Sequence, residues 1–306
     1  MKTLIINNLA SGYGQGAIYD FIRLLAKDGE EVVLRSTDGT TDIRLLMLDA
    51  ADFDLVVASG GDGTIATVAY ALAGTGVPVL PFPAGTANLL AGNVWLPNEP
   101  HALAKLAREG RTLDFDLGEL EINGGLYGFS IMAGCGYDAA IMRDAKPGKK
   151  IFGPAAYFGA AVSNIAPTHA RFRLEIDGET VEDEGVGVLI VNFSKIQFDL
   201  SVTHENQPRD GFLDVVVLRA ANALELLPAV GAVILDRSGG NPDRADLSIY
   251  RGKNIRVESD PPLQIQYDGE VVERTTPFSA RVLPGALSMV ISKEGYDLFS
   301  DDQAQV

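Results

Sequence analysis

The sequence predicts an α/β N-terminal domain, a parallel sheet covered by helices, followed by a β-rich C-terminal domain. Over the first third of the chain, short apolar runs alternate with helix-like patterns, which is typical of such a sheet. From about residue 113 onward, strand patterns and turn signals dominate. A chain of 306 residues suits two domains of roughly 100–200 residues. We place them at 1–115 and 116–306, and the last residues could pack back on the first domain.

The first domain is expected to alternate between strands and helices in chain order. Four apolar runs predict strands at Leu4–Ile6, Glu31–Leu34, Leu55–Ala58 and Val79–Pro81. Apolar residues at helical spacing predict helices at Ile18–Leu25, Ile43–Met47 and Ile65–Leu72. A turn and a short helix are expected over Thr86–Asn93.

The second domain is predicted to be mainly strands. These are expected at about Leu117–Ile122, Gly125–Ile131, Arg171–Ile176, Gly187–Asn192, Asp214–Leu218, Asn254–Glu258, Leu263–Tyr267 and Ala280–Leu283. Tight turns are indicated at Asn123-Gly124, Asp177-Gly178 and Asp268-Gly269. Two helices are expected at Pro154–Ile165 and Leu224–Leu235, and the polar end of the chain, Ser300–Val306, is expected to fray.

The composition excludes several classes of protein. With 25 basic and 41 acidic residues the net charge is −16, which argues against nucleic-acid binding by phosphate attraction and against strong adhesion to anionic lipid. One cysteine, Cys135, leaves no intrachain disulfide and no paired-cysteine metal or redox site. No apolar stretch reaches the ~20 residues of a membrane span. The N-terminus lacks a signal-peptide pattern, so a cytoplasmic protein is expected, with peripheral contact at the inner face of the membrane left open.

The first glycine-rich segment follows the first predicted strand. Gly12–Ala17 nearly fits the dinucleotide-binding fingerprint, but Asn8 to Ser11 separate it from its strand, whereas the fingerprint begins directly after one. A flexible connector would explain these glycines equally well. A nucleotide phosphate could still bind at this segment, because backbone N–H groups at a helix N-terminus attract anions.

A second loop, Ser59-Gly60-Gly61-Asp62-Gly63-Thr64, lies between a predicted strand and a predicted helix. Its glycines let the backbone approach a ligand closely, and Thr64 is expected to cap a helix whose N-terminus favours phosphate. A carboxylate at Asp62 is unfavourable beside phosphates unless a cation bridges them, so we infer Mg²⁺ nearby. The structural alternative is an ordinary strand–turn–helix connection in which aspartate serves the turn.

A third loop, Pro83–Asn88, ends the next predicted strand and adds Gly85, Thr86 and Asn88 as candidates. The carboxyl ends of parallel strands share one rim of the sheet. The three loops are therefore expected to converge on one ligand.

Taken in order, these segments resemble the catalytic domain of the diacylglycerol kinase and sphingosine kinase superfamily, most of all the soluble bacterial lipid kinases. The resemblance covers nearly the whole chain. It rests on Asn8–Gly12, Gly60–Thr64 with Pro83–Asn88, Asp210–Val215 and Tyr267–Glu270.

This resemblance implies ATP in a cleft between the two domains and transfer of its γ-phosphate, with Mg²⁺, to a hydroxyl of a lipid such as diacylglycerol. The nucleotide-binding positions would be Asn8, Ser11, Gly12, Ser59, Gly60, Gly61, Asp62, Gly63, Thr64, Gly85, Thr86 and Asn88. Asp268 would be the general base, with Glu270 beside it, and Asp62, Glu270 and Asp210 would be the metal ligands. Phosphoryl transfer needs positioning, charge neutralisation and an acceptor for the hydroxyl proton, which these residue types supply.

The chain departs from the family pattern at three positions. Leu9 replaces a proline of the first motif. Arg209 precedes Asp210 where many members carry a second acid, which puts a structural Mg²⁺ there in doubt. Leu89 stands where many bacterial members have an aspartate of the carboxylate–water–Mg²⁺ network, so that network must be completed differently.

The expected partner is a lipid with a free hydroxyl, without nucleic acid and with transient contact at a membrane surface. Apolar segments around Ile151–Phe158 and Leu224–Leu235 suit either a lipid tail or two core helices, and Lys146, Lys149 and Lys150 form either a local basic patch or a solvated loop. The alternatives are an NAD kinase and a catalytically silent nucleotide- or lipid-binding protein. The sequence leaves the oligomeric state open, a homodimer included.

Overall fold

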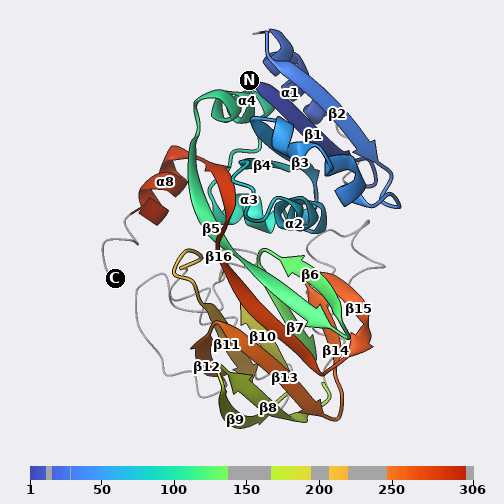
Figure 1. The fold of residues 1–306 in the computed structure, drawn as a ribbon, viewed down its shortest axis with the longest axis vertical. Coiled ribbons are helices and arrows are strands. Elements are labelled where there is room, and N and C mark those ends of the chain that lie inside the picture. Colours follow the sequence, from blue (N-terminus) through green and yellow to red (C-terminus); the bar gives the residue numbers. More distant parts are fainter. Residues whose placement is uncertain (12–15, 28, 137–166, 194–206, 220–246, 301–306) are drawn as a thin grey trace. The chain divides into compact units, whose positions relative to one another are not determined.

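The structure is a computed structural model that describes residues 1–306 except 12–15, 28, 137–166, 194–206, 220–246 and 301–306. The chain forms two compact units. The first holds Met1–Leu117, Gln207–Asp210 and Leu283–Val306, and the second holds Gly118–Asn206 and Gly211–Val282. Two long strands, β5 (Arg111–Ile122) and β16 (Phe278–Ile291), each contribute to both units (Figure 1). The chain thus returns twice to its first unit after leaving it near the predicted division.

The first unit is built on a parallel sheet, as predicted. Its strands are β1 (Lys2–Asn8), β2 (Glu31–Thr37), β3 (Leu55–Gly60) and β4 (Val79–Pro83). They lie in the order β2-β1-β3-β4, and the end of β16 joins β4 in parallel at Met289 and Val79. Every residue of β3 and all but the two end residues of β1 are buried, so the sheet is covered on both faces.

The helices of this unit partly follow the sequence pattern. They are α1 (Ala17–Lys27), α2 (Asp62–Ala71), α3 (Leu89–Asn93), α4 (Pro100–Glu109) and α8 (Lys293–Ser300), with two 3-10 turns, η1 (Ile43–Met47) and η2 (Ala50–Asp52). Helix α1 buries the predicted face through Ile18, Phe21 and Leu25. The second predicted helix is only the 3-10 turn η1, because Met47 is its one buried residue and no apolar face supports a longer helix.

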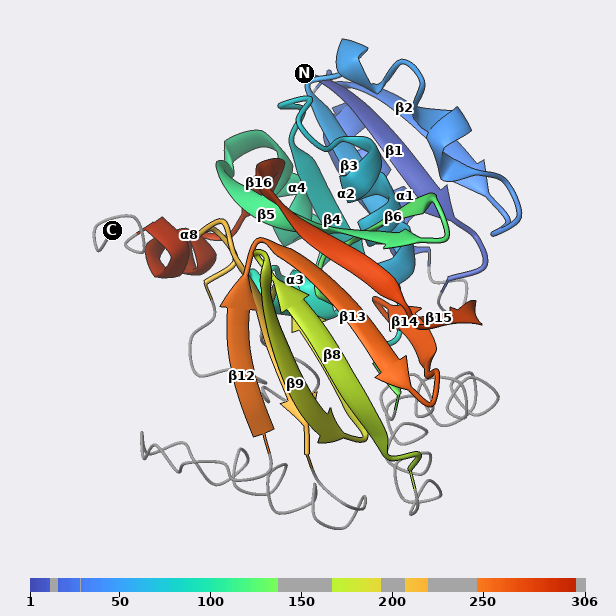
Figure 2. The same cartoon turned by 60° about the horizontal axis from the view of Figure 1, so that its bottom comes forward.

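The second unit is an antiparallel β-sandwich, which confirms the β-rich prediction (Figure 2). One sheet has the order β12-β11-β10-β7-β14-β15, and the other contains β9, β8, β13, β16, β5 and β6. The remaining strands are β6 (Gly125–Phe129), β7 (Met132–Gly136), β8 (Ala170–Ile176), β9 (Glu179–Gly185), β10 (Gly187–Val191), β11 (Leu213–Leu218), β12 (Leu247–Gly252), β13 (Asn254–Asp260), β14 (Gln264–Tyr267) and β15 (Glu270–Thr275). Phe129, Phe172 and Phe278 are buried in the core that the two sheets share.

Three two-residue turns close hairpins of this sandwich where the sequence predicts them. Asn123, Asp177 and Asp268 have φ of +50°, +50° and +42°, and the glycine after each has φ of +80° to +90°. Two successive residues with positive φ form the type I′ turn, whose twist matches that of paired strands. The predicted helices at 154–165 and 224–235 and the lysines at 146, 149 and 150 lie outside the described residues. No helix in the described part of the chain is long and apolar enough to cross a membrane.

Candidate active site

The loops after β1 and β3 meet at the carboxyl end of the parallel sheet. The Ser11 hydroxyl accepts a hydrogen bond from the backbone N–H of Gly61 at 3.3 Å. The Asn8 side-chain amide donates to the Thr64 hydroxyl at 2.9 Å. Residues far apart in sequence are thereby joined at one rim, as the strand order requires.

The loop after β4 joins them through glycine backbone. A Cβ on Gly85 would lie 2.5 Å from the Cα of Gly61, closer than packed atoms tolerate, so only glycine fits there. Asn88, with φ of +51°, closes this loop on itself. Its Oδ1 accepts from the N–H of Gly85 at 2.8 Å, and its Nδ2 donates to the carbonyl of Gly85 at 3.1 Å. The Asn88 side chain therefore shapes the loop.

Helix α2 begins earlier than predicted. Its first residue is Asp62, its N-cap is Gly61, and no side chain caps it. The expected cap, Thr64, already lies inside the helix, because its N–H donates to the carbonyl of Gly61 at 2.9 Å. The positive end of a ten-residue helix thus lies at the rim where the loops meet.

Asp62 links two helix starts. Its Oδ1 accepts a hydrogen bond from the N–H of Leu90, in the first turn of α3, at 3.2 Å. A backbone amide thus holds this carboxylate beside Leu89. One carboxylate together with phosphate oxygens is a donor set that Mg²⁺ accepts, so Asp62 fits as a metal ligand.

The other two predicted metal ligands lie in different units, Asp210 in the first and Glu270 in the second. Among the described residues, no three side chains of the His, Cys, Asp or Glu type form a group that could hold a metal ion. Arg209 precedes Asp210 in the sequence, and its guanidinium donates to the carbonyl oxygens of Asp114 and Phe299. Glu270 is exposed at the start of β15.

The remaining predicted residues of the first unit differ in accessibility. Ser59 is buried, and its hydroxyl donates to Asn7 Oδ1 at 3.0 Å, so it links β3 to β1 instead of facing a ligand. Thr86 is exposed, and Gly12 lies outside the described residues.

Sequence reasoning missed a fourth loop at this rim. The carbonyl of Thr37, the last residue of β2, accepts from the N–H of Leu9 at 2.8 Å. A Cβ on Gly39 would lie 3.3 Å from the Cβ of Ala10, so the loop after β2 packs against the loop after β1. Its position after a parallel strand was the available signal.

Asp268 is held by the chain segment that enters β7. Its Oδ2 accepts from the N–H of Ser130 at 2.6 Å and from the Ser130 hydroxyl at 2.9 Å. Its Oδ1 accepts from the N–H groups of Ile131 at 2.9 Å and Met132 at 3.0 Å. Three successive backbone amides and a hydroxyl therefore occupy the four acceptor positions of one carboxylate. We call Ser130, Ile131 and Met132 the amide clamp.

The clamp is itself supported by buried polar groups. Asn192, which is buried, donates through Nδ2 to the carbonyl of Ser130 at 2.8 Å. Its own N–H donates to the carbonyl of Ile131 at 2.8 Å. Buried Gln266 accepts from the N–H of Gly269 at 3.1 Å, which fixes the other side of the turn. The geometry of the turn is thus set from both sides.

Burial and hydrogen bonding act on Asp268 in opposite directions. Burial raises the pKa of this carboxyl to about 6, whereas the bonds from the clamp favour its charged form. The neighbouring Tyr267 also has a raised pKa, from burial and from the nearby Tyr127, Glu270 and Asp268. The rings of Tyr127 and Tyr267 lie 5.5 Å apart between centroids.

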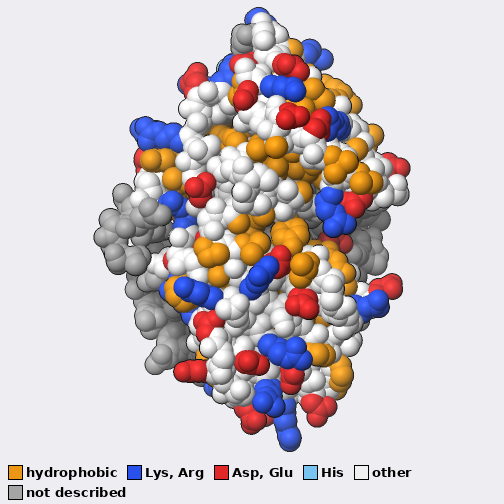
Figure 3. Space-filling view, viewed as in Figure 1, with side chains coloured by type: hydrophobic (Ala, Val, Ile, Leu, Met, Phe, Trp, Pro, Cys, Tyr) orange, Lys and Arg blue, Asp and Glu red, His pale blue; other side chains and the backbone are white. Residues whose placement is uncertain are grey.

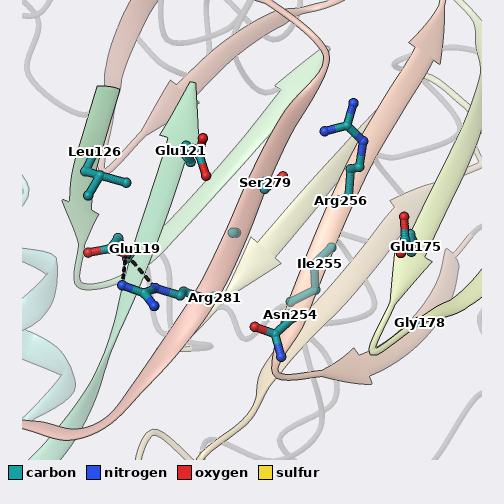
Figure 4. A pocket seen from close by; sticks show the side chains of 11 residues that line it. Glu119, Glu121, Leu126, Glu175, Gly178, Asn254, Ile255, Arg256, Ser279 and Arg281 are labelled. Carbon is teal, nitrogen blue, oxygen red and sulfur yellow. Dashed lines mark hydrogen bonds and ion pairs between the residues drawn. The ribbon is translucent and has the colours of Figure 1, made fainter. Parts of the chain in front are cut away.

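Two open grooves on the sandwich contain none of the predicted site residues. The first, of about 500 Å³, is lined by Glu119, Glu121, Leu126, Glu175, Gly178, Asn254, Ile255, Arg256, Ser279, Ala280 and Arg281. Figure 4 shows the Arg281–Glu119 ion pair, 2.6 Å long, at one end of it. The second, of about 610 Å³, lies over β8, β9 and β13. Both acidic and basic side chains line each groove, and the face seen in Figure 3 also carries both kinds of charge.

Comparisons with known proteins place this geometry in a family. The profile of the diacylglycerol kinase catalytic domain matches residues 2–120, and that of the YegS C-terminal NAD kinase beta sandwich-like domain matches residues 131–291. The chain belongs to the diacylglycerol kinase family. Its class is that of kinases with an alcohol group as acceptor, and it resembles the bacterial lipid kinases as the motifs predict.

Several relatives of this diacylglycerol kinase family member span most of the chain. It is 33% identical to a probable lipid kinase YegS-like of Pseudomonas aeruginosa over 85% of the chain and 84% of the relative. It is 26% identical to a diacylglycerol kinase of Mycobacterium tuberculosis over 96% of both. An uncharacterized Synechocystis protein is 29% identical, and the match covers 79% of the chain but only 55% of that protein.

Solved structures share the fold of this family. The structure of a putative diacylglycerol kinase from Bacillus anthracis matches 96% of the chain and 98% of its own length, with a TM-score of 0.76 and 20% identity. An NAD kinase from Archaeoglobus fulgidus in complex with ATP matches with a TM-score of 0.57 and 14% identity over the full length of both chains. The predicted fold class is confirmed.

Replacing Asp268 by asparagine should destabilise the protein. The asparagine side chain has the same shape, and its oxygen can still accept from the two donors that contact one oxygen of Asp268. Its NH₂ group would face the other two donors, so those two hydrogen bonds would be lost. We expect Asp268→Asn to lower the free energy of unfolding by about 2–4 kcal/mol, measured by denaturant unfolding. The matched control is Glu270→Gln on the same hairpin, which should change it by less than about 0.5 kcal/mol because Glu270 is exposed. Equal effects of the two variants would contradict the clamp.

The carboxyl carbon of Asp268 should titrate with a midpoint of about 6 in ¹³C NMR, with Asp268→Asn providing the assignment. Because this pKa exceeds the ordinary 3.8, the folded chain holds a proton that the unfolded chain releases between these values. The contribution of Asp268 to stability should therefore fall as the pH rises from 3.8 to about 6, and stay constant above that. A midpoint near 4 would show that the clamp outweighs burial.

Proposed function

We propose that this protein is an ATP- and Mg²⁺-dependent lipid kinase that transfers the γ-phosphate of ATP to a free hydroxyl of a lipid of the diacylglycerol type. The observation that carries the proposal is the meeting of three loops and the start of α2 around Asp62, in a chain of the diacylglycerol kinase family. The names of relatives from Pseudomonas aeruginosa and Mycobacterium tuberculosis support a lipid acceptor.

In this proposal the first unit binds the phosphates of ATP. Glycines at Gly60, Gly61 and Gly63 let the backbone approach them, and the N-terminus of α2 stabilises their negative charge. Asp62 would hold Mg²⁺, which neutralises charge on the transferring phosphoryl group. The bond from Leu90 fixes the orientation of this carboxylate.

The contacts of Asp268 bear on which acid meets the acceptor hydroxyl. Asp268 already accepts four hydrogen bonds, so it can take a proton from a lipid only after one of them opens. Glu270 lies two residues later in the same hairpin and is exposed. We therefore assign Asp268 to positioning this turn and Glu270 to contact with the acceptor hydroxyl.

Measurements of kinetics and stability on the same variants should distinguish the roles of Asp268 and Glu270. Glu270→Gln should lower kcat by about 10²–10⁴-fold, the usual contribution of a positioned proton acceptor, with wild-type stability and ATP affinity. Asp268→Asn should lose activity only together with stability. A fully active Glu270→Gln enzyme would remove Glu270 from this role and return it to Asp268.

Two other functions make different predictions. An NAD kinase shares the glycine-rich loop and, in the Archaeoglobus fulgidus structure, a related fold. However, the Asn-Glu pair expected from that family occurs here only at Asn98-Glu99, in an unsuitable context. A silent binding protein is suggested by Leu89, and it would bind ATP without transferring phosphate.

A phosphoryl-transfer assay distinguishes these functions. γ-Labelled ATP and Mg²⁺ are incubated with the protein and with detergent-dispersed diacylglycerol, sphingoid base, phosphatidylglycerol or NAD. We expect label in a lipid, and the labelled lipid identifies the acceptor. Label in NAD alone would replace the proposal by the NAD kinase function. ATP binding by calorimetry without label in any acceptor would favour the silent binding protein.

A further inference from the structure

The outer edge of β2 has no partner strand in the described part of the chain. β2 is the first strand in the sheet order and pairs with β1 alone, and Figure 1 and Figure 2 show it at the margin of the first unit. Glu31 directs its N–H to the β1 side, where it donates to the carbonyl of Met1 at 3.1 Å. Because successive strand residues direct their N–H and C=O groups to opposite sides, Val32, Leu34 and Ser36 direct theirs outward. This edge therefore presents a row of donors and acceptors to a further strand.

The edge of β2 lacks the features that protect other edges of the same chain. Proteins commonly protect an edge strand with lysine, proline, a bulge or an inward-pointing charge. β9, at the opposite end of the strand order, carries three exposed glutamates and turns Asp183 inward to accept from the Tyr250 hydroxyl. β15, the edge of the other sheet, follows a register shift between Gln264 and Gln266. β2 contains neither lysine nor proline, and its register with β1 is unbroken over seven residues.

The residues of β2 are complementary to a second copy of themselves. The segment Glu31-Val32-Val33-Leu34-Arg35 has an acid at one end, a base at the other and three apolar residues between them. Antiparallel pairing of two such strands about Val33 places Glu31 opposite Arg35 of the second copy and Val32 opposite its Leu34. Each of these pairs occurs twice by symmetry. Opposite charges and apolar residues placed directly across from each other stabilise a strand pair.

The backbone favours the same register. Val32 and Leu34 both direct their N–H and C=O groups outward, so each pair of Val32 with Leu34 of the second copy can exchange two hydrogen bonds. A register centred on Leu34 would place Arg35 opposite Val33, and one centred on Arg35 would bring two like charges together. Only the register about Val33 combines the hydrogen bonds with opposite charges at both ends.

The exposed side chains of β2 are positioned for such a partner. Leu34 is 38% exposed, although it lies in the middle of the strand. Arg35 donates to Asp49 at 2.7 Å between Nη2 and Oδ2, and its side chain remains 27% exposed. The bond to Asp49 thus orients the guanidinium and leaves part of it accessible to a second carboxylate.

We propose that two copies of this chain associate by antiparallel pairing of their β2 strands about Val33, so that the sheets of their first units become one sheet. The interface is isologous, because the two-fold axis brings the same patch of each copy together. At a net charge of −16 the copies repel each other overall, so association depends on the local pairs of Glu31 with Arg35. The interface uses none of the residues assigned to phosphoryl transfer and is independent of the proposed function.

Sedimentation of the full chain tests the association. At micromolar concentration we expect a particle of twice the 32.6 kDa of one chain. Leu34→Lys should raise the dissociation constant by about tenfold or more, because lysine on an edge opposes strand pairing. The matched control is Leu298→Lys, since Leu298 is 49% exposed on α8, which follows β16 at the far side of β4, and this variant should remain dimeric. A monomeric wild type, or a Leu34→Lys variant as dimeric as the control, would overturn the proposal.

Cross-linking tests the register. In a non-hydrogen-bonded antiparallel pair the two Val33 Cα atoms lie about 4.5 Å apart, within the range of a disulfide. The one native cysteine, Cys135, is buried, so Val33→Cys introduces the accessible thiol. Under copper–phenanthroline and air we expect Val33→Cys to form a covalent dimer. Val32→Cys should form about tenfold less, because its two copies lie on a diagonal of about 7–8 Å. Equal cross-linking of the two variants, or none in either, would contradict the register.

Exchange of charges between two variants tests the pairs of Glu31 with Arg35. Glu31→Arg alone places like charges opposite each other, and so does Arg35→Glu, made together with Asp49→Asn to avoid repulsion within the chain. Each variant alone should have a dissociation constant about tenfold or more above the wild type. An equimolar mixture of the two restores opposite charges at both ends, and we expect it to form a heterodimer with wild-type affinity. A mixture that stays monomeric while both variants keep the wild-type Tm would overturn the proposal.

Discussion

Close contact between two backbones, at Gly61 and Gly85, is the constraint on which the arrangement of the loops after β3 and β4 depends. A Cβ on Gly85 would lie 2.5 Å from Gly61, so any side chain would push the loops after β3 and β4 apart. The same Cβ would lie 3.0 Å from Asn88 Oδ1, so it would also crowd the bonds between Asn88 and Gly85 directly before α3. Since Leu90 of α3 holds Asp62, the carboxylate would lose its orientation as well.

In the second unit, the charged side chain of Asp268 holds two chain segments together, whereas the first unit relies on a close contact between glycines. The amide clamp brings three backbone N–H groups together, and the Asp268 carboxylate accepts a hydrogen bond from each of them. The same bonds tie the β14–β15 turn to the start of β7, because the backbone N–H of Asp268 also donates to the carbonyl of Met132 at 2.8 Å. Asp268, which the sequence motif indicates as a catalytic residue, therefore also fixes the β14–β15 turn in which it lies.

Sequence reasoning recovered what periodicity and turn chemistry determine locally. Buried runs such as Leu55–Ala58 and Asx-Gly pairs such as Asp268-Gly269 gave the strands and hairpin turns, and the order of parallel strands gave the converging loops. It missed α4, although Pro100 at its start and the buried Leu103, Ala104 and Ala107 are helix signals. It also missed α8, whose largest buried side chain, Phe299, packs edge-on against Phe115 of β5.

Hydrogen-bond partners at the site could not be predicted in the same way, because they depend on residues distant in sequence. Ser59 sits within the glycine motif, yet its hydroxyl faces Asn7 in the interior, since β1 and β3 pair side by side. Thr64 was expected as a cap, yet its hydroxyl accepts from Asn8, which a different strand supplies. Motif residues were therefore identified by type and position, whereas their individual roles required the pairing of the sheet.

The residue at position 89 determines how much negative charge lies near Asp62 in the proposed site. An acid at this position would add a second negative charge near Asp62, and both would contribute to metal affinity before ATP arrives. Here Leu89 adds no charge, and Asp62 accepts a hydrogen bond from the backbone N–H of Leu90. A single carboxylate binds Mg²⁺ weakly, since this ion keeps most of its water unless phosphates replace it. Under the proposed function, Asp62 would therefore hold Mg²⁺ only together with the phosphates of ATP, and its role would be to orient that ion.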